Sequence, residues 1–216
     1  MPVEKGQVLL INKPLHWTSF DVVKKLRNHL GVKKIGHAGT LDPLATGLLI
    51  LCTGPMTKQI ENFQSLDKTY TGTLVIGQTT PSYDLETEKS TPIATSHIDE
   101  EDLQLAAKKL TGTISQIPPA FSAVRVGGSR SYKHARAGRE VSLSPRMVEV
   151  HSFQIINFDL PGVSFKVRCS KGTYIRSLVN DFGQLLGVGA YLAELKRTRI
   201  GQYDLEDALE IEEVTS

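Results

Sequence analysis

The sequence has few cysteines and no long apolar run. Its two cysteines, Cys52 and Cys169, lie in separate apolar stretches, and neither belongs to a CxxC pair. This pattern excludes disulfide-rich secreted folds, and we expect a reduced, cytoplasmic chain. No segment approaches the roughly 20 apolar residues that a membrane-spanning helix needs, and the N-terminus lacks a signal-peptide pattern. We therefore expect a soluble protein with no membrane partner.

Motifs for common cofactors are also missing. The six histidines form no HExxH pair, and no Cys/His cluster has the spacing of a zinc site, so we expect no metal. Neither GxxxxGK[ST] nor GxGxxG is present, which argues against a nucleotide cofactor. A hydrolase triad has no GxSxG elbow to support it. The sequence predicts chemistry that side chains carry without a cofactor.

Charge is nearly balanced overall but is unevenly distributed. The net charge is +2. Residues 121–150 carry six Lys or Arg against two acids, and residues 166–201 carry seven against two. Residues 82–109 carry seven acids against three bases, and residues 204–213 carry six acids and no base. A basic face that binds nucleic acid would explain this segregation, and so would ordinary solvated surface.

Hydrophobic periodicity predicts an α+β fold. With 216 residues, 40% of them hydrophobic, the chain can form one domain, residues 1–216, with an inserted arm. Alternating or continuous apolar residues predict strands at 7–11, 48–52, 68–76, 147–158, 163–169 and 191–200. Helical spacing and capping residues predict helices from Thr18 or Ser19 to 30, at 56–63 and 99–110, and from Thr173 to 186. An acidic helical tail closes the chain.

One loop, Gly36-His37-Ala38-Gly39-Thr40-Leu41-Asp42-Pro43-Leu44-Ala45-Thr46-Gly47, runs into the apolar strand 48–52. Its three glycines permit positive φ angles, and Pro43 fixes its own φ, so we expect a loop with a defined shape. Asp42 is its only acid. On residue types alone, Asp42 either caps an Asp-Pro turn or acts in catalysis.

Two further side chains have a structural and a functional interpretation. Arg176 falls in the first turn of its predicted helix, where a cation conflicts with the macrodipole unless an anion lies nearby. Asp42 is a candidate for that anion, and the alternative is an arginine that folds back into solvent. Tyr70 lies on the apolar face of strand 68–76, where it is either core or part of a site.

The segment 116–147 does not read as part of a core. Consecutive prolines, Pro118 and Pro119, cannot lie in a central strand, and a basic, glycine-punctuated run follows. This run is either a projecting arm that settles onto phosphates or a solvated hairpin.

The motifs together resemble the TruB family of tRNA pseudouridine synthases over nearly the whole chain, from Leu10 to Gly201. The loop 36–48 resembles the family's catalytic motif, in which the aspartate before proline is catalytic. Other resembling segments are Lys13-Pro14 with Thr18-Ser19, Lys68-Thr69-Tyr70, Ser170-Lys171-Gly172-Thr173-Tyr174-Ile175-Arg176, and Leu195-Lys196-Arg197-Thr198. The segment 116–138 resembles the family's RNA-gripping thumb.

The chain departs from the family pattern in two places. His16 stands where the first motif has glycine, which affects the local backbone more than the chemistry. Pro81 and Ser82 replace an aspartate and a threonine in the loop that precedes Asp84, so contacts through that loop are the least secure. Many bacterial members carry a C-terminal PUA domain, and only the 15 residues 202–216 follow Gly201. We expect no PUA domain here, whether the chain is a short form or was cut.

The resemblance implies the pseudouridine synthase fold, with a mixed, mostly antiparallel central sheet flanked by helices and a thumb at about 116–147. It implies that uridine 55 in the T loop of tRNA is flipped out and converted to pseudouridine. Asp42 would act as nucleophile or as base, Arg176 would keep it ionised, and Tyr70 would stack on the base. Implied substrate contacts are Lys13, His37, Asp84, Leu195, Tyr174, Lys171, Arg125, Tyr132 and Arg136.

Of these, His37 would wedge into the T loop, although a lone loop histidine can also be structural. The expected partner is the tRNA T stem-loop, and we expect a monomer. Two alternatives stay open. One is a non-catalytic RNA-folding chaperone that uses the same basic face, and the other is a synthase that acts at a different uridine.

Overall fold

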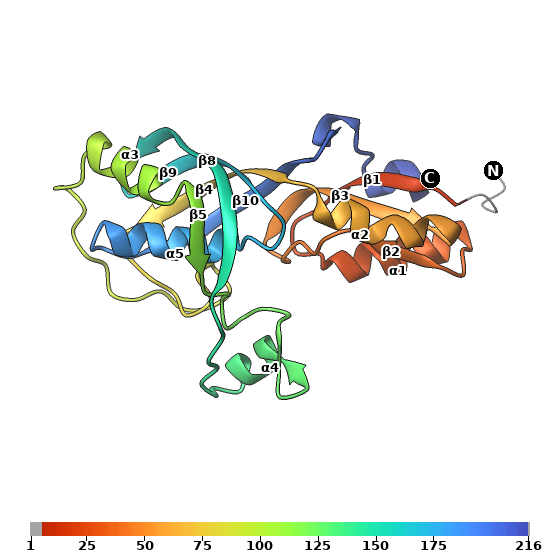
Figure 1. Cartoon of the computed structure of the whole chain (residues 1–216), viewed down its shortest axis with the longest axis horizontal. Coiled ribbons are helices and arrows are strands. Elements are labelled where there is room, and N and C mark those ends of the chain that lie inside the picture. Colours follow the sequence, from red (N-terminus) through yellow and green to blue (C-terminus); the bar gives the residue numbers. More distant parts are fainter. Residues whose placement is uncertain (1–5, 216) are drawn as a thin grey trace. The chain divides into compact units, whose positions relative to one another are not determined.

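The computed structural model describes residues 6–215. The chain divides into two compact units, which we call unit 1 (Met1–Thr71 with Leu195–Ser216) and unit 2 (Gly72–Glu194). Figure 1 traces the elements of both units in chain order. None of the described helices is long and apolar enough to cross a membrane.

Unit 1 is built on an apolar strand, β3 (Ala45–Thr53), that is buried on both faces. Its strands follow the order β1-β3-β10-β4. In addition, β2 pairs with β3 and β11 pairs with β10. Strands β3 and β10 pair in parallel, with Leu195 opposite Ala45. The other elements are β1 (Val8–Lys13), α1 (Ser19–Leu30), β2 (Ile35–His37), η2 (Gly54–Gln59), α2 (Ile60–Ser65), β11 (Tyr203–Asp204), η3 (Leu205–Asp207) and α6 (Ile211–Thr215).

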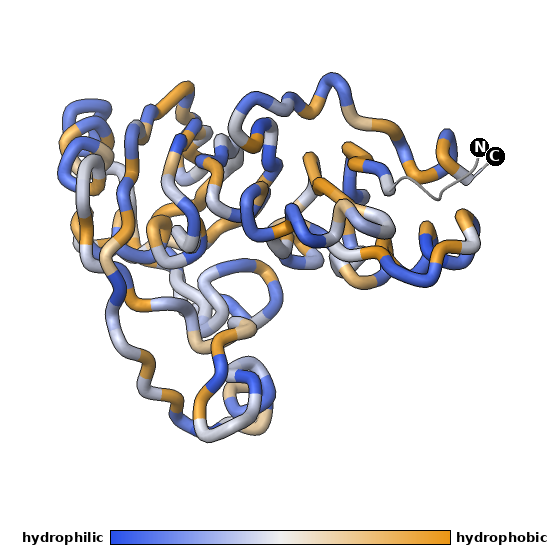
Figure 2. The backbone as a smooth tube through the Cα atoms, turned by 45° about the vertical axis from the view of Figure 1, so that its right-hand side comes forward, coloured by the Kyte–Doolittle hydropathy of each residue, from blue (hydrophilic) through white to orange (hydrophobic). Residues whose placement is uncertain are grey.

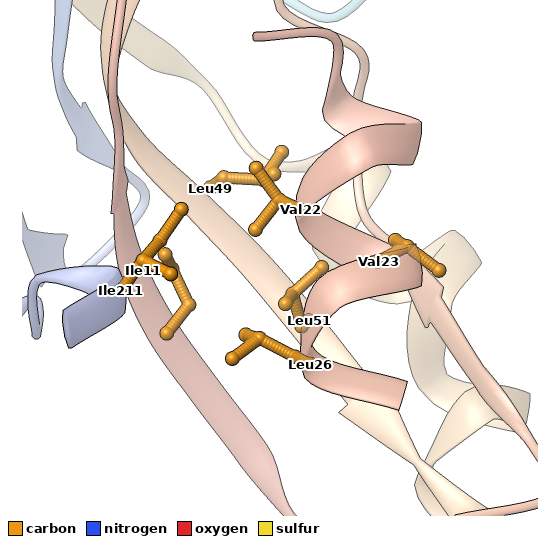
Figure 3. Close-up of a cluster of buried hydrophobic side chains, with 7 residues drawn as sticks. All are labelled: Ile11, Val22, Val23, Leu26, Leu49, Leu51 and Ile211. Carbon is orange, nitrogen blue, oxygen red and sulfur yellow. The ribbon is translucent and has the colours of Figure 1, made fainter. Parts of the chain in front are cut away.

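Helix α1 covers one face of β3. Orange and blue alternate along the α1 tube in Figure 2, as expected of a helix with one apolar side. Figure 3 shows its apolar side chains gathered against β1, β3 and α6 in a cluster of Ile11, Val22, Val23, Leu26, Leu49, Leu51 and Ile211. Thr18 caps the helix through a capping box with Asp21, and Gly31 ends it with φ 62°. The predicted boundaries and apolar face of this helix are confirmed.

Unit 2 contains an antiparallel sheet with helices packed on it. Its strand order is β10-β4-β9-β8-β5, and the strands are β4 (Lys68–Ile76), β5 (Gly112–Gln116), β8 (Arg146–Asp159), β9 (Gly162–Cys169) and β10 (Ala190–Ile200). Strands β4 and β10 each pass from one unit into the other. The helices are α3 (Glu100–Lys109), α4 (Ser131–Arg136) and α5 (Ile175–Leu185). Three aromatic rings join sheet and helix. The Phe153 ring centroid lies 5.7 Å from that of Phe165, in an edge-to-face contact, and 5.5 Å from that of Phe182, in a tilted one. The predicted α+β class, with a mostly antiparallel sheet flanked by helices, is confirmed.

Four sequence predictions need correction. Tyr174, not Thr173, is the N-cap of α5, because the Thr173 hydroxyl donates to the Ser170 carbonyl instead. The strand β5 was not predicted, and β3 begins three residues before the predicted Leu48. The acidic tail forms only short helices at 205–207 and 211–215.

The thumb segment has little core of its own. Two short strands, β6 (Arg125–Val126) and β7 (Ser129–Arg130), form a hairpin, and the unpredicted helix α4 follows. In Figure 1 this segment stands clear of the sheet of unit 2, beyond the ends of β5 and β8. No hydrophobic residue between 120 and 145 is buried, so the segment projects as an arm that contains a hairpin.

Candidate active site

The loop that carries Asp42 connects β2 to β3 in unit 1. Gly39 and Gly47 have φ angles of 93° and 102°, which other residues rarely adopt. At Gly47 a β-carbon would also lie 2.4 Å from the Arg197 carbonyl oxygen, so the close pairing of β3 with β10 requires glycine. Gly36 does not have the positive φ angle that we expected. Glycine fits there because a β-carbon would lie only 2.8 Å from the Ile60 side chain.

Neighbouring elements hold the loop by its backbone. The Ser19 hydroxyl, at the start of α1, accepts from the Leu41 N–H at 2.9 Å and donates to the Leu41 carbonyl at 3.2 Å. On the other side of Asp42, the Pro43 carbonyl accepts from the His16 N–H at 2.8 Å. The Asp42 carbonyl itself accepts from the Ala45 N–H at 3.0 Å and closes a turn. Asp42, half-buried, is therefore flanked by fixed peptide groups.

Arg197 is a site residue that sequence reasoning missed. It is 1% exposed, and its guanidinium donates to the Leu48 carbonyl at 2.7 Å and to the Gly39 carbonyl at 3.2 Å. It thus ties together the two sides of the loop. The family resemblance singled out Leu195 in the segment 195–198 and gave Arg197 no role, although strand alternation places Arg197 on the same face as Leu195.

A second buried cation lies in the same unit. The Lys13 side chain is fully buried, and its ammonium donates to the Pro14 and Trp17 carbonyls at 2.9 and 2.6 Å. Burial lowers the pKa of Lys13 to about 8, and the Asp42 carboxylate opposes that shift while the Arg197 charge adds to it. Lys13 thus lies within electrostatic reach of Asp42.

Three other predicted residues lie in unit 1. His37 ends β2, and burial together with the Arg197 charge lowers its pKa, which keeps the imidazole neutral at pH 7. Leu195 pairs with Ala45, at the end of the Asp42 loop. Tyr70 is 9% exposed on β4, as a residue on the apolar face should be.

In unit 2, Arg176 is buried and fully directed inward. It is 4% exposed, so the interpretation as a solvent-facing arginine is wrong. The guanidinium donates to the Ser82 carbonyl at 3.2 Å and the Phe121 carbonyl at 2.9 Å, and it lies 3.5 Å from the Asp84 carboxylate. Asp84 is 5% exposed. An anion therefore does accompany Arg176 at the start of α5, and in this unit it is Asp84.

The departures at Pro81 and Ser82 leave Asp84 well held. Two hydroxyls, of Thr80 and Ser82, donate to the Asp84 carbonyl at 2.7 and 3.2 Å. Ser82 also bonds Thr87 across the turn at 2.8 Å. A parallel bridge joins Asp84 to Leu192, at the beginning of β10.

The remaining predicted contacts lie on the thumb and beside it. Arg136 pairs with Glu86 at 2.7 Å and lies 5.4 Å from the Tyr132 ring. Tyr174 exchanges hydrogen bonds with the Gln116 side chain, at 2.8 and 3.1 Å, and Arg146 lies over its ring. Arg125 and Lys171 are exposed. The thumb thus presents cations and aromatic rings, with Arg136 held by an acid of the loop 77–90.

Comparisons with known proteins identify the family. A profile of the TruB family pseudouridylate synthase N-terminal domain matches residues 27–175, and a profile of the tRNA pseudouridylate synthase B C-terminal domain matches residues 176–216. The chain belongs to the TruB family of pseudouridylate synthases. The tRNA pseudouridine synthase B of Flavobacterium johnsoniae is 51% identical over 214 residues, covering 96% of this chain and 93% of that relative. Its namesake from Phocaeicola vulgatus is 50% identical over 218 residues, covering 98% and 93%.

Solved structures show the same fold. An archaeal box H/ACA sRNP Nop10–Cbf5 complex contains a chain with TM-score 0.73 and 26% identity, covering 99% of this chain and 53% of that one. An H/ACA RNP bound to a substrate RNA containing 2′-deoxyuridine gives TM-score 0.72 and 25% identity, covering 98% and 54%. The TruB-family chain described here thus spans about half the length of those solved chains, and it has the pseudouridine synthase fold.

The residues that the TruB resemblance singled out fall into two sets. Unit 1 holds Asp42, Lys13, His37, Tyr70 and Leu195, and unit 2 holds Asp84, Arg176, Lys171, Tyr174, Arg125, Tyr132 and Arg136. Within each set the TruB residues have defined neighbours. The pairing of Asp42 with Arg176 stays a prediction.

Proposed function

We propose that this chain converts uridine 55 in the T loop of tRNA to pseudouridine. Its place in the TruB family and its similarity to enzymes named tRNA pseudouridine synthase B support this substrate. The reaction breaks the C1′–N1 glycosidic bond, rotates the uracil and rejoins it through C5. The single structural observation behind the proposal is the Asp42 loop, whose backbone is held on both sides of the acid. Such preorganisation is what a reacting carboxylate needs.

Asp42 is the reacting group in this proposal. It acts either as the nucleophile at the sugar or as the base that removes a sugar proton, and both roles require its ionised form. The positive charge of Lys13 favours that form, because the two groups attract each other. Arg176 would add to this attraction on binding, and Tyr70 would stack on the uracil. Asp84 and Leu195 would contact the base.

The substrate is held by its shape and phosphates. A uridine stacked in the T loop must be flipped out, which costs a few kcal/mol, and contacts elsewhere must offset this. The exposed cations Arg125 and Lys171, with Arg136 and Tyr132 of the thumb, are suited to such contacts. His37, neutral at pH 7, fits insertion into a loop of bases better than a charged imidazole would. We expect a monomer in the cytoplasm, where the buried cysteines Cys52 and Cys169 stay reduced.

The decisive experiment replaces the carboxylate. The variant Asp42→Asn should bind unmodified tRNA as tightly as the wild type and form no pseudouridine, because the amide neither attacks nor accepts a proton. Sequencing the modified RNA after incubation with the wild type should place pseudouridine at position 55. An active Asp42→Asn enzyme would exclude the mechanism, and modification at another uridine would exclude the site. Binding without any modification by the wild type would favour the RNA chaperone.

A further inference from the structure

An open hollow lies on the solvent side of α1, in unit 1. Its volume is about 450 Å³, and it is lined by His16, Trp17, Asp21, Lys24, Lys25 and Asn28. The opposite side of the helix faces the core through Val22, Val23 and Leu26 (Figure 3). The hollow therefore belongs to a surface that folding leaves open, and none of the residues proposed above to react with or contact the RNA lines it.

The charge around this hollow is mostly positive. Asp21 is the only acid between residues 14 and 41, whereas Lys24, Lys25, Arg27, Lys33 and Lys34 are all exposed. The Asp21 carboxylate is engaged by the helix cap, since the Thr18 N–H and hydroxyl donate to it at 2.9 and 2.6 Å. The exposed lysines fit an anionic partner such as a phosphodiester backbone.

An exposed aromatic ring lies beside these cations. Phe20 is 61% exposed, although a phenylalanine on a helix normally faces the core. Phe20, Lys24 and Arg27 follow the i, i+4, i+7 spacing and share one face of α1. An aromatic platform interleaved with cations is the pattern that binds unpaired nucleotides, because bases stack on the ring while phosphates meet the cations.

A strained residue connects the hollow to the Asp42 loop. His16 has φ 66°, in the left-handed region that side chains with a β-carbon disfavour. Its N–H donates to the Pro43 carbonyl, directly after Asp42, while its exposed side chain lines the hollow. Strain that persists in this way concentrates at functional sites. The imidazole thus reaches a ligand in the hollow from the same peptide unit that braces the reacting loop.

We propose that the α1 surface (His16, Phe20, Lys24, Lys25 and Arg27) is a second RNA-binding surface, on which an unpaired stretch of the tRNA lies while its uridine occupies the Asp42 site. Lys24, Lys25 and Arg27 bind phosphates, and Phe20 stacks on a base. This proposal rests on the proposed function for the identity of the RNA. It adds a contact region that is separate from the thumb.

The first test measures the dissociation constant for unmodified tRNA at several salt concentrations. Lys24→Gln/Lys25→Gln should weaken binding about tenfold near physiological salt and lower the slope of log Kd against log salt by about two, because two phosphate contacts are lost. Lys108→Gln/Lys109→Gln is the matched control, an adjacent exposed lysine pair on α3 in an acidic segment. The control should stay within twofold of the wild type. Unchanged affinity and slope in the α1 variant would overturn the proposal.

Two further variants separate binding from folding. Phe20→Ala should weaken tRNA binding about tenfold with an unchanged salt slope, since stacking releases no ions. His16→Gly should raise the melting temperature, because glycine relieves the strain, and should nevertheless weaken binding severalfold. If His16→Gly only stabilised the fold, or Phe20→Ala bound normally, the surface would have another role, such as contact with a protein.

The same enzymes also report on the proposed function. The single-turnover rate of the Lys108→Gln/Lys109→Gln control should equal that of the wild type at every tRNA concentration. The α1 variants should need more tRNA to reach half of their own maximal rate, because the surface binds RNA. A wild type that bound tRNA through α1 but made no pseudouridine would contradict the proposed function alone. A fully active wild type with α1 variants that bind normally would contradict the α1 surface alone.

Discussion

Lys13 carries a positive charge in a place where charge is unfavourable. Its pKa is lowered from the ordinary 10.5 to about 8, with burial as the main cause. Between these two values the unfolded chain binds more protons than the folded one, so the contribution of Lys13 to stability rises with pH. Burial of this ammonium destabilises the fold. We infer that Lys13 is kept for its interaction with Asp42 and not for stability.

This reasoning gives a pH prediction for Lys13. Relative to Lys13→Met, the wild type should gain about 2 kcal/mol of unfolding free energy between pH 7.5 and 9.5, as the folded lysine becomes neutral. Urea titrations of both proteins across this range measure the difference, and the variant cancels the titration of all other groups. A difference that is constant with pH would mean that Lys13 keeps an ordinary pKa.

Arg197 is the residue on which the shape of the Asp42 loop most depends. Arg197→Met should lower the unfolding free energy by about 2–4 kcal/mol, because the Leu48 and Gly39 carbonyls lose their donors inside the protein. Its single-turnover rate should fall at least tenfold while tRNA affinity changes little, since the loop and not the RNA surface is altered. Arg197→Lys should recover part of the stability but little of the rate, because an ammonium cannot span both carbonyls.

Arg199 supplies a control for Arg197. It lies two residues away on the same strand, is about half exposed, and pairs with Asp204 at 3.0 Å on the surface. Arg199→Met should change stability by less than about 1 kcal/mol and leave the rate unaffected. Equal effects at both positions would mean that Arg197 acts only through strand β10 and not through the loop.

Among the elements, the thumb helix α4 carries a contact with a testable consequence. Its Arg136 pairs with Glu86, and both side chains are partly exposed. An RNA phosphate can bind Arg136 only if the ion pair with Glu86 breaks, so Glu86 competes with the substrate for this arginine. Glu86→Gln should therefore bind tRNA about two- to fivefold more tightly, with stability unchanged within about 1 kcal/mol. Fluorescence anisotropy with labelled tRNA measures the affinity.

Glu88 provides the comparison for Glu86. It is an exposed acid two residues along the same loop, and its replacement by glutamine removes the same charge. Glu88→Gln should alter tRNA affinity less than Glu86→Gln does. Equal gains would point to general charge repulsion, and weaker binding by Glu86→Gln would mean that Glu86 positions Arg136 for the RNA.

Elements with strong local patterns were predictable from sequence. The run Lys68–Ile76, rich in β-branched and aromatic residues, forms β4 with the predicted ends, and Thr18 and Gly31 bound α1 as expected. Strand β5 was missed because Gly112, Thr113 and Ser115 give no clear alternation. It forms by pairing with β8, whose residues follow 30 to 38 positions later in the chain. The short helix α4 lacks a side-chain cap, so no local signal marks its start.

The candidate site was predictable where a motif names a residue, and not where distant contacts define it. Asp42, Lys13 and Arg176 came from motifs. The partners of Arg176 and Arg197 could not be derived, because the Ser82 carbonyl is 94 positions from Arg176 and the Leu48 carbonyl is 149 positions from Arg197. Such contacts arise from the order of strands in the sheet, which residue patterns alone do not fix.

At the scale of the whole molecule, the segments that form the hydrophobic core differ from the arm that we propose to bind RNA. The buried hydrophobic residues of unit 2 lie outside residues 120–145. The arm beyond Ala123 contains only short elements, closed by local hydrogen bonds such as that from the Ser131 N–H to the Val124 carbonyl. A segment that buries so little apolar surface contributes little to the unfolding free energy.

We therefore predict that the arm can be replaced without loss of the fold. Substituting residues 124–141 with a Gly/Ser linker of equal length keeps the Phe121 carbonyl that accepts from Arg176. The melting temperature should stay within a few degrees of the wild type, whereas tRNA binding should weaken at least tenfold, because four arginines of the arm, at 125, 130, 136 and 139, are removed. A linker variant that unfolds would show that the arm supports the sheet, and one that binds tRNA normally would show that the RNA lies elsewhere, with the α1 surface as the next region to remove.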